Sequence, residues 1–121
     1  MWFDVSLEQD YLKANLFGRE TAEQTREFLQ AVTAESLKLG CARILISVHA
    51  SRPIFRVEQY HLSAYIKELA TRPSYKIALL GDSDETRASH EYIEMLARQH
   101  GVNIRCLLDE AAAVQWLRSI P

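Results

Sequence analysis

Two short segments, residues 43–48 and 76–80, are almost uninterruptedly apolar and rich in branched side chains. Such runs are typical of strands that are covered on both faces, as in the parallel sheets of α/β proteins. The chain between these two segments has apolar residues at helical spacing, namely Leu62, Tyr65, Ile66 and Leu69. We therefore expect a strand, a helix and a second parallel strand at the centre of the sheet, joined by a right-handed crossover.

The N-terminal third of the chain predicts a hairpin followed by a helix. Apolar and polar residues alternate over residues 3–7 and again over residues 12–16, which is the pattern of an antiparallel β-hairpin with one covered face. Thr21 and Gln24 then have the spacing of a capping box at the start of a helix. Gly40 is the residue at which we expect this helix to end.

The C-terminal third predicts two further helices and a last strand. A helix follows the second central strand and ends near Gly101, and alternating residues over 102–108 predict a half-exposed strand near the sheet edge. A short apolar stripe then predicts a closing helix. The whole chain, residues 1–121, is expected to form one α/β domain: a mixed five-stranded sheet with an N-terminal β-hairpin and four helices.

Composition narrows the classes of function. The 14 basic and 16 acidic residues give a formal net charge of −2, and because the basic residues are scattered we expect no nucleic acid as a partner. No apolar run approaches the roughly 20 residues of a transmembrane segment, so we expect a cytoplasmic protein. Cys41 and Cys106 have no paired spacing, and His61, His90 and His100 complete no ligand set. We therefore expect no disulfide, no metal and no cofactor.

The loop after the first central strand, residues 49–55, is the main candidate site. In α/β proteins, binding sites gather where a central strand passes into the next helix. His49, Arg52 and Arg56 are candidates for an anion site there, or else are simply solvated. Ser51 is either a turn and capping residue or a place where a phosphate would be favoured at a helix N-terminus. The candidate binding set is completed by Ile54, Phe55 and Tyr60.

Several segments that share their order and spacing along nearly the whole chain carry a family resemblance. They are the hairpin, RILISV at 43–48 with SRPIF at 51–55, IALL at 77–80, ARQHG at 97–101 and DEAAAVQWL at 109–117. Together they resemble a small bacterial family described as SpoIIAA-like, or STAS/SEC14-like. The resemblance implies a fold like that of anti-sigma-factor antagonists, which bind partner proteins and are switched by phosphorylation of a serine at this junction. That serine would be Ser51, in a loop without the Asp-Ser-Ser-Gly element of that class.

Two non-enzymatic functions follow from these observations. The leading prediction is a regulatory or protein-interaction module that uses residues 49–55, because no catalytic set is evident and the scaffold offers a polar loop. The alternative is a carrier of a small apolar ligand or lipid, with a cavity beside the same loop. Candidate lining residues for such a cavity are Ile54, Phe55, Val57, Tyr60 and Tyr65.

An enzyme is the third hypothesis, and we predict that the protein is not one. Catalysis would need His49 or His61 as a general base beside an acidic partner, and the spacing of the sequence indicates no such pair. Trp2 and Trp116 either pack in the fold or form an aromatic surface for a partner. We also expect a homodimer, formed through a sheet face that the helices leave partly uncovered.

Overall fold

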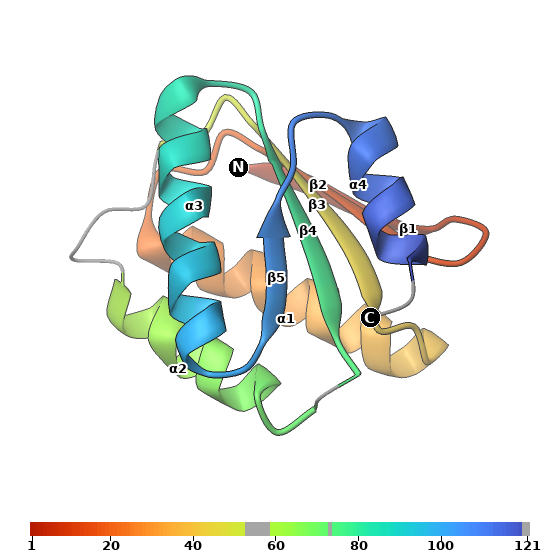
Figure 1. Ribbon diagram of the computed structural model, residues 1–121. Coiled ribbons are helices and arrows are strands. Elements are labelled where there is room, and N and C mark those ends of the chain that lie inside the picture. The colour runs from red at the N-terminus through yellow and green to blue at the C-terminus, as the bar shows by residue number, and fades with distance from the viewer. Residues whose placement is uncertain (53–58, 73, 120–121) are drawn as a thin grey trace.

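The computed structural model describes residues 1–52, 59–72 and 74–119, with the backbone alone over residues 59–63. The elements follow one another as β1 (Trp2–Leu7), β2 (Leu12–Phe17), α1 (Ala22–Leu39), β3 (Arg43–His49), α2 (Gln59–Leu69), β4 (Lys76–Gly81), α3 (Asp84–Gln99), β5 (Asn103–Cys106) and α4 (Glu110–Arg118). The strands form one sheet in the order β1-β2-β3-β4-β5, with β1 antiparallel to β2 and all other neighbours parallel. The predicted α/β class, the mixed five-stranded sheet and the four helices are confirmed (Figure 1).

The helices begin and end at the residues that the sequence marks for this purpose. The hydroxyl of Thr21 accepts the backbone N–H of Gln24 at 3.2 Å and so caps α1. Gly40 ends the same helix in the left-handed conformation, at φ 64°, which glycine adopts without strain. Ser83 caps α3 in the same manner through the N–H of Thr86. The predicted capping residues of α1 are therefore confirmed.

The last strand is shorter than the alternation over residues 102–108 predicts. β5 ends at Cys106, although Leu107 still donates its backbone N–H to the carbonyl of Leu79 at 3.0 Å. Leu108 is 80% exposed. The reason is the next residue, Asp109, whose carboxylate caps α4 by accepting the N–H of Ala112 at 2.8 Å. The chain leaves the sheet to start this helix, so Leu108 lies outside the strand and its apolar side chain is exposed to solvent.

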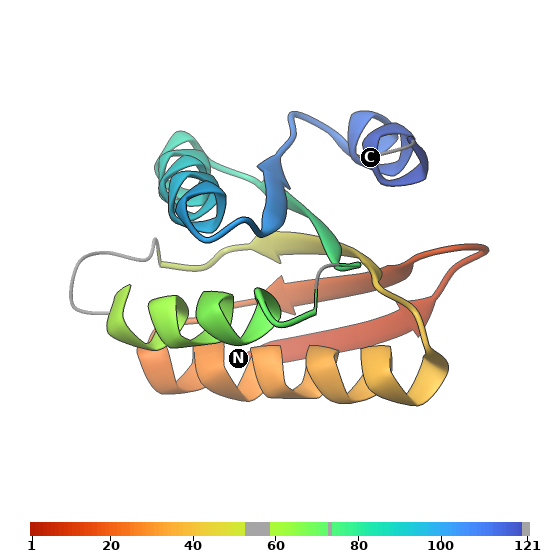
Figure 2. The same cartoon turned by 60° about the horizontal axis from the view of Figure 1, so that its bottom comes forward.

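The helices are divided unequally between the two faces of the sheet. On one face α1, α2 and α3 contribute Phe28, Ile66 and Ile93 to the larger hydrophobic core. Of the described helices, only α4 covers the other face, where its Leu117 packs near Ala78 of β4. Figure 1 shows α3 and α4 on opposite sides of β4 and β5, and Figure 2 shows α1 and α2 lying side by side.

Part of the second sheet face is left open by α4, which packs on β3 and β4. On that face Trp2, Phe17 and His49 occupy one row across β1, β2 and β3. The ring centroids are 4.9 Å apart for Trp2 and Phe17 and 4.5 Å apart for Phe17 and His49. Trp2 is nevertheless 59% exposed. The described residues therefore leave this face of the sheet partly uncovered, and the homodimer expected there stays a prediction.

Candidate functional site

The predicted loop starts where the sequence places it, at the carboxyl end of β3. Its first residues are described: His49 ends the strand, and Ser51 and Arg52 follow it. The other candidate residues lie outside the described part of the chain, namely Ile54, Phe55, Arg56 and, for its side chain, Tyr60. The roles expected of these four residues stay predictions, as does that of Val57.

The side chain of His49 lies on the open face of the sheet. Its ring stacks on Phe17 with the two planes 13° apart, and its Nε2 atom is 2.9 Å from the hydroxyl of Ser47. The guanidinium of Arg52 makes a different contact, donating to the carbonyl of Glu20 at 3.4 Å. His49 and Arg52 are thus engaged with separate parts of the fold.

Ser51 and Arg52 join the loop to the segment between β2 and α1. The hydroxyl of Ser51 accepts the backbone N–H of Arg19 at 3.0 Å and donates to the carbonyl of His49 at 2.9 Å. The N–H of Arg52 donates to the carbonyl of Arg19 at 2.9 Å, and the guanidinium of Arg19 donates to the carbonyl of Arg52. These bonds agree with the interpretation of Ser51 as a turn residue. Its phosphorylation stays a prediction.

An open polar depression lies over this junction, at the carboxyl ends of β3 and β4. One of its walls is held by Asp82, whose carboxylate accepts the N–H of Ala50 at 2.9 Å. That contact fixes Ala50 in the left-handed conformation, at φ 47°, which a residue other than glycine seldom adopts. The depression is lined by Arg19, Glu20, Ala50, Ser51, Arg52, Asp82, Ser83 and Glu85.

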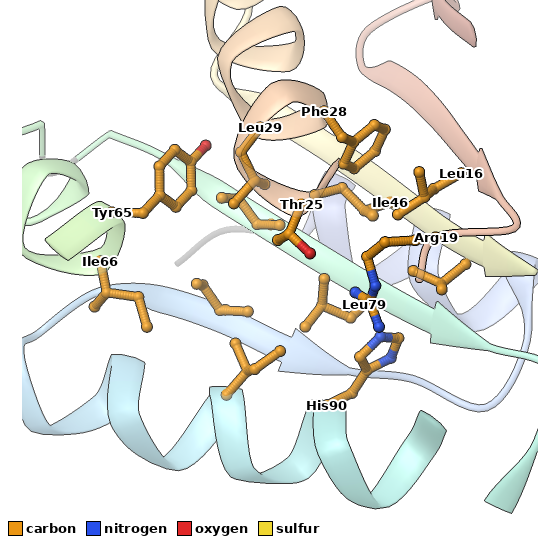
Figure 3. Close-up of a pocket in the computed structure, with 14 residues that line it drawn as sticks. Leu16, Arg19, Thr25, Phe28, Leu29, Ile46, Tyr65, Ile66, Leu79 and His90 are labelled. Carbon is orange, nitrogen blue, oxygen red and sulfur yellow. The ribbon is translucent and has the colours of Figure 1, made fainter. Parts of the chain in front are cut away.

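A second space lies inside the molecule, between the sheet and helices α1, α2 and α3 (Figure 3). The cavity has a volume of about 50 Å³. A single water needs about 10–15 Å³, so the cavity is small but larger than one water. It is lined by Leu16, Arg19, Thr25, Phe28, Leu29, Ile46, Val48, Tyr65, Ile66, Ile77, Leu79, His90, Ile93 and Ile104.

Arg19 and His90 are the two basic side chains in the otherwise largely apolar lining of the cavity. Arg19 lies two residues after the end of β2 and is only 5% exposed, although it also lines the polar depression. His90 is 3% exposed and lies on the buried side of α3 with Ile93 and Ala97. Burial, and to a smaller extent the charge of Arg19, lowers the pKa of His90 from 6.5 to about 4. The imidazole is therefore neutral at pH 7, and its Nδ1 atom has no hydrogen-bond partner among the described residues.

Tyr65 closes the cavity on the side of α2. Its hydroxyl lies 3.1 Å from that of Thr33 on α1, so the polar end of this side chain is used between the two helices. Burial raises the pKa of Tyr65 above its usual value. Tyr65 thus lines this cavity, and the ligand-carrier role expected of it stays a prediction.

The positions of Arg19 and His90 in this cavity were not predicted from the sequence. Arg19 follows a strand that is parallel to β3, so it lies at the same sheet edge as residues 49–52. This position of Arg19 could have been predicted from the sequence, because the carboxyl ends of parallel strands meet at one end of the sheet. His90 occupies the inner stripe of a predicted helix, where a histidine is more often a packing residue than a ligand.

The described residues contain no group of three or more His, Cys, Asp or Glu side chains placed to hold a metal ion. None of the described helices combines the length and the apolar character needed to cross a membrane. Comparison of the chain with known protein families and with curated proteins gave no match.

Proposed function

We propose that this protein binds a small, slender apolar ligand in the cavity between the sheet and helices α1, α2 and α3. The observation that carries the proposal is the cavity itself, which is bounded mainly by aliphatic and aromatic side chains. Protein interiors are normally packed as densely as organic crystals, and unfilled apolar space lowers stability because its lining atoms lose contacts. A ligand that fills the space restores those contacts and stabilises the fold.

The dimensions of the cavity restrict what the ligand is. The cavity volume is about 50 Å³, which is too little for a bulky ring system. A single alkyl chain has the smallest cross-section among apolar ligands, so it is the shape of ligand that we propose. Its walls come from regular elements, with Ile46 and Leu79 on the sheet and Phe28 and Ile93 on the helices, so the shape of the site is largely fixed.

The test uses octan-1-ol as a defined ligand and a substitution that fills the cavity. Titration followed by methyl NMR is expected to shift the resonances of Ile66, Ile77 and Ile104, which line the space. Leu29→Trp puts a larger side chain into the same space, so we expect it to abolish these shifts. Leu37→Trp is the matched control, because Leu37 is exposed on the same helix, and it should bind as the wild type does.

Native mass spectrometry of the protein as purified gives a second measurement. A copurifying ligand is expected with the wild type and with Leu37→Trp, and none with Leu29→Trp. If octan-1-ol leaves the methyl resonances of the wild type unchanged, the proposal is wrong.

A second candidate function, a regulatory interaction module, is supported by one further observation. Arg19 lines both the internal cavity and the outer polar depression, and its backbone and side chain are bonded to Ser51 and Arg52. A ligand that moves Arg19 would thereby change the surface that residues 49–52 present to a partner protein.

Quantitative affinity purification tests this second function. A genuine partner should be recovered by the wild type and lost with Arg52→Glu, which reverses a charge on the depression. Arg105→Glu, on the exposed side of β5, makes the same charge change elsewhere and should retain the partner. Recovery of one identical set of proteins by all three would contradict the interaction module.

A further inference from the structure

The internal cavity has one polar end and one apolar end. Figure 3 shows the guanidinium of Arg19 and the ring of His90 pointing toward one another, while Tyr65 and Ile66 line the opposite end. Both polar side chains are more than nine-tenths buried. The hydroxyl of Tyr65 is engaged with Thr33 of α1, so Arg19 and His90 set the polarity of the space.

The two side chains bring different chemistry to this end of the cavity. Arg19 is a permanent cation with a planar set of N–H donors, and it donates to the carbonyl of Arg52. His90 is a neutral ring whose buried Nδ1 atom has no partner among the residues described. Buried polar atoms are almost always hydrogen-bonded, so an unpartnered one facing a cavity indicates a missing ligand or water. With its proton on Nδ1, the neutral imidazole is a donor.

A guanidinium beside an imidazole donor matches the two oxygens and the single negative charge of a carboxylate. A phosphate group carries more oxygens and more charge than two donors in a narrow apolar space satisfy. An alcohol presents one oxygen and no charge, so it gains little from the cation. The apolar remainder of the cavity, toward Ile66 and Ile104, requires an aliphatic tail.

We propose that the ligand is an aliphatic monocarboxylate, with its carboxylate held between Arg19 and His90 and its chain lying along the sheet toward Ile66 and Ile104. This inference rests on the proposed function, because it names the chemical class of ligand for the same cavity. Arg19 also lines the polar depression outside, so the charged end of the ligand lies next to the surface and the chain lies inside.

The first test compares octanoate with octan-1-ol on the wild-type protein at neutral pH. The two probes have chains of equal length and differ only in the head group. Titration calorimetry should give a dissociation constant about tenfold or more lower for octanoate, as expected for a charge-assisted contact in a buried site. The imidazole resonances of His90 should shift strongly with octanoate and weakly with octan-1-ol.

The outcomes of this comparison separate the two proposals. If octan-1-ol binds as tightly as octanoate, the carboxylate inference is wrong and the apolar binding function stands. If neither probe binds, both are wrong.

Substitution of the head-group residue gives an independent test. Arg19→Met should abolish the preference for the carboxylate, so that octanoate and octan-1-ol bind this variant with equal affinity. Arg105→Met, which removes an exposed arginine that does not line the cavity, should retain the full preference for octanoate. Arg19→Lys keeps the charge and should retain part of the preference. Should Arg19→Met not fold, the wild-type comparison decides the inference by itself.

Discussion

His90 is held uncharged inside the fold, at the polar end of the cavity. Its pKa falls from 6.5 to about 4 because the ring is buried and because Arg19 faces it. Between these two values the unfolded chain binds a proton that the folded protein does not. Stability is therefore expected to be full above about pH 6.5 and to fall as the pH is lowered toward 4, by roughly 3 kcal/mol from this residue. Chemical denaturation at a series of pH values measures the loss.

A pair of substitutions assigns this pH dependence to His90. His90→Gln removes the titrating group, so its unfolding free energy should change less between pH 6.5 and 4 than that of the wild type. His100→Gln is the matched control, because His100 is exposed at the end of the same helix. Equal pH slopes for His90→Gln and the wild type would contradict the prediction.

Gly81 is needed for a close approach between the end of β4 and the start of α3. A Cβ atom built at this position would lie 2.8 Å from the Cγ2 atom of Thr86, a buried residue that bonds the capping serine Ser83. We expect Gly81→Ala to lower the unfolding free energy by about 1–3 kcal/mol, the usual cost of overpacking. Thr86→Ser removes the methyl group and keeps the hydroxyl, so the double substitution should recover part of the loss. Simple additivity in this double-mutant cycle would show that no clash exists.

Single residues also mark the limit of prediction from sequence. Thr21 and Gly40 were predicted correctly because caps depend on the few residues beside them. Arg19 and His90 could not be paired in the same way, since 70 positions of sequence separate them and only the parallel arrangement of β2, β3 and β4 brings them together. A cavity is a property of that packing and leaves no local pattern in the chain.

Lys76 connects an element of the sheet to the last helix. Its ammonium donates to the carbonyl of Trp116 and, at 3.0 Å, to that of Ser119, and it lies 4.6 Å from the centroid of the Trp116 ring. Burial lowers the pKa of Lys76, which is only 5% exposed. The cation thus gives the carbonyl groups at the end of α4 a further donor, which comes from the sheet.

We expect Lys76→Met to weaken the docking of α4 on the sheet. The substitution keeps much of the apolar stem and removes the donor, so the unfolding free energy should fall by about 1.5–3 kcal/mol, the range for hydrogen bonds to charged groups. Lys38→Met, at an exposed position in the last turn of α1, should change it by less than about 0.5 kcal/mol. Thermal and chemical unfolding, followed by the fluorescence of Trp116, measure both. Equal losses would mean that Lys76 does not hold the helix.

Helices and strands were predicted correctly where a single local sequence pattern determines their type and their ends. The runs at residues 43–48 and 76–80 became β3 and β4, the two strands with neighbours on both sides and helices on both faces. β5 was predicted too long because alternation continues through Leu108, while Asp109 already starts the next helix. The docking of α4 through Lys76 was not predicted, since the contact joins residues 40 positions apart.

In the whole molecule, the carboxyl ends of strands β2, β3 and β4 lie side by side and bring the cavity and the loop together. The sequence predicted the loop after β3 as the site, and residues 49–52 do lie at the carboxyl end of that strand. It did not predict that the neighbouring strand β2 supplies Arg19, the residue that lines both the inner cavity and the outer depression. The hairpin of β1 and β2 therefore contributes to the site as well as to the sheet. The end of β2 positions Arg19 beside residues 49–52.

The contact between Ser51 and Arg19 makes this arrangement testable. Ser51 lies outside the cavity lining, yet its hydroxyl accepts the N–H of Arg19 at 3.0 Å and ties that residue to the end of β3. Ser51→Ala removes the tie, so we expect octanoate affinity to fall roughly three- to tenfold while octan-1-ol affinity stays unchanged. Ser74→Ala, an exposed site in the turn before β4, should affect neither. Calorimetry with both probes decides: equal octanoate affinity in Ser51→Ala and wild type would mean that the loop and the cavity act independently.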